Sequence, residues 1–122
     1  LHKLSGRAHQ VITGVCLTTK EKQVNFSVET DVTFKTLTDE AIHYYVEHYR
    51  PFDKAGAYGI QEWIGHVGVT GMNGSYFNVM GLPVQRIYEA LRMFEHVKKT
   101  LNVGFFKIKI CGYKNYSYLC TY

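Results

Sequence analysis

Two kinds of position alternate along the chain from residue 24 to residue 34. Every second residue belongs to a mostly apolar set, and polar residues lie between its members. The set consists of Val24, Phe26, Val28, Thr30, Val32 and Phe34. A period of two residues predicts a β-strand with one face on a core and the other face polar. The stretch VITGVCL at 11–17 is also rich in strand-forming residues, and a polar turn at 19–22 separates the two. The pattern therefore predicts a β-hairpin.

Two helices are predicted after this hairpin. Thr38 followed by two acidic residues is typical of a helix N-terminus, and the helical pattern ends at Arg50-Pro51 because a residue before proline disfavours helix. The apolar face of this helix consists of Ile42, Tyr45, Val46 and Tyr49. A second helix is expected to open at 81–83, where proline occupies the first turn. Its apolar stripe consists of Val84, Ile87, Leu91 and Phe94.

The segment between these helices is rich in glycine. The stretch DKAGAYGIQEWIG at 53–65 places three glycines around Gln61. Because glycine weakens regular elements, such a cluster indicates a backbone that turns sharply or approaches another group closely. Val67 and Val69 are expected in a strand, followed by a turn at 71–74. A further strand is predicted for FFKIKI at 105–110, and the residues after it have no clear period.

Composition indicates one ordered domain. The 122 residues are 46% hydrophobic and 20% charged, which argues against disorder. The net charge of +4 suits an anionic ligand such as a nucleotide, although a slightly basic surface explains it equally well. Neither a signal peptide nor a membrane-spanning apolar run is present in the sequence, so we expect a cytoplasmic location and no membrane partner. The chain begins at Leu1, which suggests a piece of a longer protein.

Three cysteines, Cys16, Cys111 and Cys120, cannot all pair within one chain, and none forms a CxxC motif. Structural zinc is therefore improbable. Cys16 lies in the predicted hairpin and is expected to be a small buried hydrophobic residue. The six histidines fit no familiar metal-ligand spacing.

Polar residues near the glycines are the first candidates for a site. Lys54 either reaches a phosphate or is an exposed lysine without a specific contact. The Gln61 amide suits a nucleobase edge, or else stabilises the loop. Glu29 and Asp31 share the polar strand face, where a solvated surface is favoured over a divalent-cation site. Since the sequence has neither a Walker motif nor GxGxxG after a strand, the residues alone indicate an α/β domain with a glycine-lined polar pocket.

Four motifs in order resemble the Maf family of nucleoside triphosphate pyrophosphatases. They are LSGRAHQVITGVCL (4–17), FSVETDVTF (26–34), YRPFDKAGAYGIQ (49–61) and NGSYFNVMGLPV (73–84). The resemblance implies a mixed α/β fold, similar to that of inosine triphosphatases, with an elongated twisted sheet and flanking helices. On this basis residues 1–96 are the C-terminal portion of such a domain, incomplete at its N-terminus, and residues 97–122 are an atypical extension.

The same resemblance implies an enzyme that cleaves a nucleoside triphosphate into monophosphate and pyrophosphate, with Mg²⁺ or Mn²⁺ as cofactor. The Gly-Ile-Gln sequence resembles the dTTP/UTP-cleaving branch, which also takes modified pyrimidine nucleotides and sanitises the nucleotide pool. At the position of Gln61 the family places a residue that influences base choice. Lys54 and Arg7 are then expected on the phosphate side. Family members are cytoplasmic and often dimeric, so a homodimer is one possible assembly.

Two family motifs are absent from these residues. The Ser-x-Ser-Pro-Arg-Arg segment binds phosphate, and the Ala-Asp-Thr motif carries the aspartate that acts as general base. No catalytic residue can therefore be named in this chain. The alternative is a catalytically inactive Maf-like fragment that at most binds nucleotide. A basic nucleic-acid-binding domain is disfavoured, because Phe26 and Phe34 fall on the apolar side of the strand.

Overall fold

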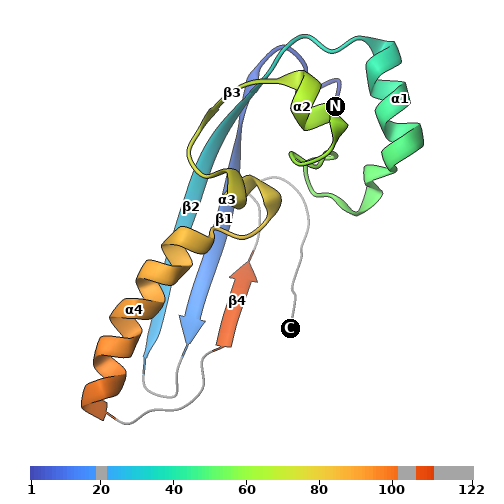
Figure 1. The fold of residues 1–122 in the computed structure, drawn as a ribbon. Helices are drawn as coiled ribbons and strands as arrows, with labels where there is room; N and C mark the ends of the chain where they lie inside the picture. Colours follow the sequence, from blue (N-terminus) through green and yellow to red (C-terminus); the bar gives the residue numbers. More distant parts are fainter. Residues whose placement is uncertain (19–21, 102–106, 112–122) are drawn as a thin grey trace.

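The two long predicted strands form an antiparallel hairpin at the centre of the fold (Figure 1). In the computed structural model, β1 spans Ala8–Thr18 and β2 spans Gln23–Phe34, with Val15 opposite Phe26. The structure describes residues 1–18, 22–101 and 107–111, and it describes side chains only up to residue 93. The predicted hairpin is confirmed, while most of its polar turn lies outside the described residues.

Two short strands extend the hairpin into a four-stranded sheet. β3 (Val69–Asn73) pairs with β2, and β4 (Lys107–Cys111) pairs with β1, both antiparallel. The strand order is therefore β3-β2-β1-β4. β4 confirms part of the strand predicted at 105–110, whereas the tail at 112–122, with Cys120, lies outside the described residues. The mixed α/β class, an elongated sheet with flanking helices, is confirmed.

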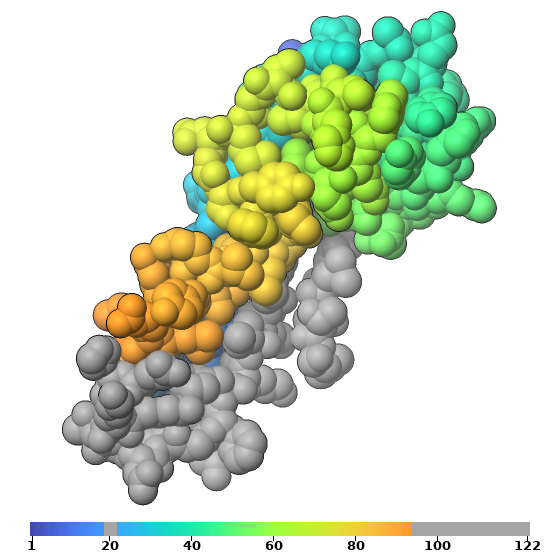
Figure 2. All heavy atoms as spheres, in the orientation of Figure 1, coloured from blue at the N-terminus to red at the C-terminus, as the bar shows by residue number. Residues whose placement is uncertain are grey.

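Helices flank both ends of the hairpin (Figures 1 and 2), and hydrophobic residues of the sheet pack against them. Val32 and Phe34 of β2 are buried, as the alternation predicts. The larger cluster lies where α1 and α2 meet the sheet, and it consists of Phe34, Leu37, Ile42, Tyr45, Tyr58, Ile60 and Ile64. The smaller one joins Val15 and Leu17 of β1 to Ile87 of α4.

The first helix, α1, spans Asp39–Tyr49 and begins as predicted. The Thr38 hydroxyl accepts a hydrogen bond from the backbone N–H of Ala41, which satisfies one of the free donors at the helix start. Arg50 ends the helix in a left-handed conformation with a φ of 45°, and η1 (Pro51–Asp53) follows directly. The predicted boundaries of this helix are confirmed.

The segment from 63 to 80 differs from the prediction. Residues Trp63–Gly68 form α2, so Val67 is helical and the strand begins only at Val69. The predicted turn at 71–74 is also wrong, because β3 continues to Asn73 and only Gly74, with a φ of +128°, leaves the strand. Tertiary packing explains α2: Ile64 and Gly68 are buried, and a Cβ at Gly68 would lie 3.1 Å from the Phe34 ring.

Helix α4 (Val84–Leu101) begins after Pro83, as predicted. Ile87 is buried and Leu91 is half-buried, but Val84 is exposed and does not belong to the apolar stripe. The Phe94 side chain lies outside the described residues. Among the helices that the structure describes, none is long and apolar enough to cross a membrane.

A short helix that the sequence did not reveal, α3 (Tyr76–Met80), is fastened to the hairpin by Asn78. The Asn78 side chain is fully buried, and its Nδ2 donates to the carbonyl oxygens of Val11 (3.3 Å) and Val28 (3.1 Å) and to Thr30 Oγ1 (3.0 Å). One amide group thus joins α3 to both central strands.

Replacing Asn78 with alanine should therefore destabilise the chain. The change leaves buried carbonyl oxygens without a donor, at a cost of about 2–3 kcal/mol in the free energy of unfolding. Denaturant unfolding measures this cost. Asn73→Ala, at an exposed position on β3, is the control and should stay within about 0.5 kcal/mol. Equal stability of the two variants would contradict the role assigned to Asn78.

Candidate functional site

The glycine-rich segment forms a loop that leads into α2 (Figure 1) and follows η1 in the chain. Its residues Tyr58 and Ile60 belong to the larger hydrophobic cluster. The Ala57 N–H donates to the Lys54 carbonyl, and the Glu62 N–H donates to the Gly59 carbonyl, so the loop contains two consecutive turns. Ile60 is buried in the middle. This loop, residues 54–62, is called the recognition loop below.

Close packing, and not flexibility, explains two of its glycines. A Cβ at Gly59 would lie 2.8 Å from Glu62 Cδ, because the Glu62 side chain lies directly over that backbone. At Gly65, in the first turn of α2, a Cβ would lie 1.9 Å from the Ile60 carbonyl oxygen. The predicted close approach is confirmed, and the approaching groups belong to the chain itself.

A buried tyrosine holds the recognition loop from α1. The Tyr45 hydroxyl donates to Glu62 Oε2 and accepts from the Gly59 N–H at 3.0 Å. The other carboxylate oxygen of Glu62 lies 3.5 Å from Lys54 Nζ. Burial and the hydrogen bond to Glu62 raise the pKa of Tyr45 above its ordinary value, so this hydroxyl remains a donor at neutral pH.

Gln61 lies between Gly59 and Glu62, the two loop residues that the Tyr45 hydroxyl binds. Its side chain is exposed, and within the part of the chain that the structure describes it has no hydrogen-bond partner. The interpretation of Gln61 as a loop-stabilising amide is therefore not supported. With respect to the described residues, its amide keeps one acceptor and two donors available to a ligand.

Lys54 is paired, which contradicts the picture of a lysine without specific contacts. Its Nζ lies 3.6 Å from Asp53 Oδ2 and 3.5 Å from Glu62 Oε1, with a quarter of the side chain exposed. Pairs of this length and exposure contribute little to stability. They do, however, place Lys54 beside the residue that follows Gln61.

Arg7 does not contact the polar group formed by Tyr45, Glu62 and Lys54. It is exposed just before β1, and its backbone carbonyl accepts from the Phe34 N–H at 3.1 Å. Within the described residues its guanidinium forms no hydrogen bond or ion pair. The expected phosphate-side role of Arg7 stays a prediction.

His9 connects β1 to the recognition loop, and sequence reasoning assigned it no role. Its Nε2 lies 2.7 Å from the Tyr58 hydroxyl, and its ring stacks on Phe34 with centroids 5.5 Å apart. The two partners are 49 residues apart, so no local pattern reveals the contact. Tyr45 and Glu62 were missed as polar partners for the same reason, although a tyrosine predicted on a buried face signals a hydroxyl that needs a partner.

Acid should weaken this end of the fold through His9. Burial lowers the pKa of His9, so the unfolded chain binds a proton more readily than the folded chain does. The free energy of unfolding should therefore fall as the pH drops from about 7.5 to about 5.5. A His9→Gln variant should lose part of this dependence, whereas His66→Gln, at an exposed position, should retain it. Identical pH profiles for all three chains would contradict this role.

The acidic pair on β2 matches the favoured interpretation of a solvated strand face. Glu29 and Asp31 are exposed, and Gln10 Nε2 lies 3.4 Å and 3.2 Å from their oxygens. Among the described residues, no three His, Cys, Asp or Glu side chains gather as a metal site would require. The donor set described here therefore does not fit a metal ion by itself.

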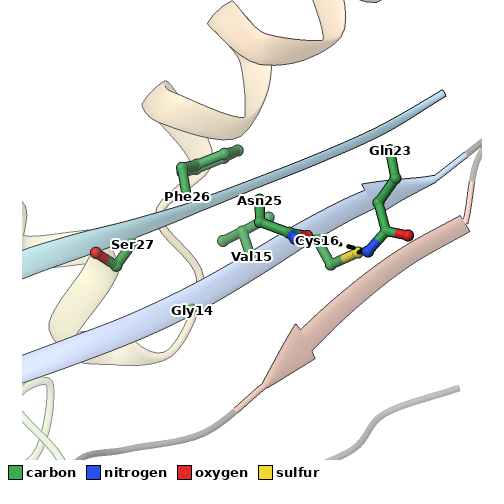
Figure 3. Close-up of a pocket in the computed structure, with 7 residues that line it drawn as sticks. All are labelled: Gly14, Val15, Cys16, Gln23, Asn25, Phe26 and Ser27. Atoms are coloured by element: carbon green, nitrogen blue, oxygen red, sulfur yellow. Dashed lines mark hydrogen bonds between the residues drawn. The ribbon is translucent and has the colours of Figure 1, made fainter.

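A shallow hollow lies near the turn of the hairpin (Figure 3). It has a volume of about 550 Å³, is largely open to solvent, and is lined by β1 and β2 residues that include Gly14, Cys16 and Phe26. Cys16 is half-buried and accepts from Gln23 Nε2 at 3.1 Å. The prediction that Cys16 is a buried hydrophobic residue is wrong, because it lies on the opposite strand face from Val15 and Leu17.

Comparisons with known proteins agree on one family. Residues 1–94 match the family described as Maf-like protein. A dTTP/UTP pyrophosphatase of Parabacteroides distasonis is 62% identical over 94 residues, which are 77% of this chain and 49% of the relative. Proteins of the same name from Phocaeicola vulgatus (66% over 92 residues; 75% and 48%) and Porphyromonas gingivalis (54% over 94 residues; 77% and 47%) are also similar. The chain thus spans about half the length of the curated relatives it matches.

Proposed function

The chain belongs to the Maf family, and we propose that it supplies the base-recognising part of a nucleoside triphosphate pyrophosphatase acting on dTTP and UTP. One observation supports this proposal above the others. The amide of Gln61 extends, exposed, from a loop that is tied to the core on both sides of it. Relatives 54–66% identical to this chain are named for dTTP and UTP.

Thymine and uracil offer an edge that a glutamine amide complements. Their 4-carbonyl accepts a hydrogen bond and their N3–H donates one, while an amide supplies a donor and an acceptor side by side. Base selection by Gln61 through these two bonds is our proposal. A polar group left unpaired in such a site costs about 1–3 kcal/mol, so an amide held in one orientation rejects a base that presents its donor and acceptor in the opposite order.

The proposed reaction adds water across the bond between the α- and β-phosphates and releases a monophosphate and pyrophosphate. Lys54 is proposed on the triphosphate side, where its partly exposed Nζ can exchange a 3.5 Å contact with Glu62 for a phosphate oxygen. Arg7 is proposed to assist there. No general base is assigned within this chain, so no proton transfer is attributed to its residues.

We also propose that the enzyme requires Mg²⁺ or Mn²⁺ and that it acts on modified pyrimidine nucleotides, which would sanitise the nucleotide pool. A cytoplasmic location and a homodimer are proposed as well. Among the described residues no cluster of His, Cys, Asp or Glu side chains could hold a metal ion alone. The division at residues 96 and 97 likewise stays a prediction.

Two alternatives remain distinct from this function. An inactive fragment that only binds nucleotide would show the same loop. A nucleic-acid-binding domain using strand aromatics is less favoured. Phe34 is buried, and Phe26 is half-buried with the Arg86 guanidinium 5.3 Å from its ring.

Equilibrium titration of the 122-residue chain with single nucleotides tests base recognition without requiring turnover. We expect dTTP and UTP to bind at least about tenfold more tightly than dCTP and GTP, the effect of one well-made hydrogen bond. Equal affinities for all four nucleotides would contradict the proposal. Tight binding with this selectivity supports both the enzyme and the inactive alternative, which an assay of pyrophosphate release separates.

A further inference from the structure

The recognition loop is fixed by one buried hydroxyl group. Tyr45 has no exposed surface, and its hydroxyl both donates to Glu62 and accepts from the Gly59 N–H. Both bonds lie across the boundary between α1 and the loop. Losing this hydroxyl would leave a backbone donor and a carboxylate without their partner, which costs more than an exposed bond would.

Glu62 is turned toward the core and not toward its own helix. It is the N-cap residue of α2, yet its side chain makes no capping hydrogen bond. The carboxylate instead bridges the Tyr45 hydroxyl and Lys54 Nζ. A residue that gives up the ordinary capping bond for a contact with a buried tyrosine ties the end of the loop to α1.

Gln61 lies between the two loop residues that hydrogen-bond to Tyr45. Gly59 is held at its backbone N–H and Glu62 at its carboxylate, while Ile60 and Ile64 are buried on either side. The backbone of Gln61 therefore has little freedom, whereas its side chain is exposed. A recognition group on a fixed backbone binds with less loss of conformational entropy than one on a mobile loop.

We propose that Tyr45 and Glu62 are positioning residues that set base selectivity through Gln61 without touching the nucleotide. This inference rests on the proposed function, because it assumes that Gln61 reads the base. It goes beyond the proposed function in one respect, because it requires base selectivity to depend on the buried Tyr45 hydroxyl of α1.

Tyr45→Phe and Tyr49→Phe form a matched pair for the test. Tyr49 lies on the same helix, its ring stacks on Tyr45 with centroids 5.1 Å apart, and 40% of its surface is exposed. In the 122-residue chain, we expect Tyr45→Phe to raise hydrogen exchange at residues 57–62 about tenfold or more. The ratio of dTTP to dCTP affinity should fall about five- to tenfold. Tyr49→Phe should change neither quantity.

Variants at Glu62 keep the test decisive if Tyr45→Phe fails to fold. Glu62→Gln retains an acceptor for the Tyr45 hydroxyl and should keep most of the selectivity. Glu62→Ala removes that acceptor and should lose it. Selectivity that is equal in these two variants would overturn the inference, as would unchanged loop exchange in a folded Tyr45→Phe chain.

A Gln61→Glu variant separates failure of this inference from failure of the proposed function. If Gln61→Glu alters the dTTP to dCTP ratio but Tyr45→Phe does not, the positioning role is wrong and the proposed function stands. If Gln61→Glu leaves the ratio unchanged, or the unaltered chain binds no nucleotide, the proposed function fails for this chain and the positioning role fails with it.

Discussion

Gly65→Ala is expected to lower the free energy of unfolding by about 3 kcal/mol or more, at the upper end of what overpacking costs. The added Cβ would lie 1.9 Å from the Ile60 carbonyl oxygen and 2.6 Å from its carbon. Backbone atoms cannot move aside as the end of a flexible side chain can. Helix α2 must therefore shift away from Ile60, which opens the larger hydrophobic cluster at Ile64.

Thermal unfolding measures this effect against Gly71→Ala. A Cβ at Gly71 would meet only Thr33, at an ordinary contact distance of 3.8 Å, so this control should stay within about 1 kcal/mol of the unaltered chain. If Gly65→Ala melts at the same temperature as Gly71→Ala, the packing of α2 on Ile60 described above is incorrect. Nucleotide selectivity should also decline in Gly65→Ala, since Ile60 precedes Gln61.

Gln61→Glu is expected to lower the ratio of dTTP to dCTP affinity by about 10–100-fold, the discrimination that one bidentate base contact provides. The substitution keeps the size of the side chain but removes its donor. A carboxylate cannot donate to the 4-carbonyl of thymine, whereas it can accept from the 4-amino group of cytosine. An alanine would only remove the bonds to thymine, whereas the glutamate also offers an acceptor to the cytosine amino group, so the glutamate variant gives the sharper contrast.

The ratio of two triphosphates removes the general effect of the added negative charge, because both ligands carry the same phosphates. Gln85→Glu makes the same change at an exposed position of α4 and should leave the ratio unaltered. Competitive titration of each variant with the two nucleotides measures it. An unchanged ratio in Gln61→Glu would show that another residue selects the base.

Local patterns predicted the parts of the fold that depend on local physics. The hairpin followed from the alternation in β2, and α1 followed from the Thr38 cap and the break at Arg50-Pro51. Helix α2 was missed because it is six residues long and contains two glycines, so its helical state depends on packing against Phe34 and Leu37. Asn78 was missed because its partners lie on strands that are distant in sequence.

The candidate site was predictable only in part. The glycine cluster and the resemblance pointed to Gln61 and Lys54, and the structure places both in one loop. The Tyr45–Glu62 contact could not be predicted, because the sequence shows only that Tyr45 belongs on an apolar face. The glycine cluster predicted a sharp turn or a close approach without identifying the approaching group, and Gly59 and Gly65 make room for Glu62 and the Ile60 carbonyl.

Pyrophosphate release by a hybrid enzyme tests the central claim most directly. Residues 1–94 of this chain would replace the matching stretch of the Parabacteroides distasonis relative, to which they are 62% identical. We expect the hybrid, supplied with Mn²⁺, to release pyrophosphate from dTTP and UTP in preference to dCTP and GTP. The 122-residue chain alone should be slower by about 10²-fold or more, since it lacks the general-base motif. A folded hybrid that releases no pyrophosphate from any of the four nucleotides, while the unaltered relative is active, would contradict the proposed function.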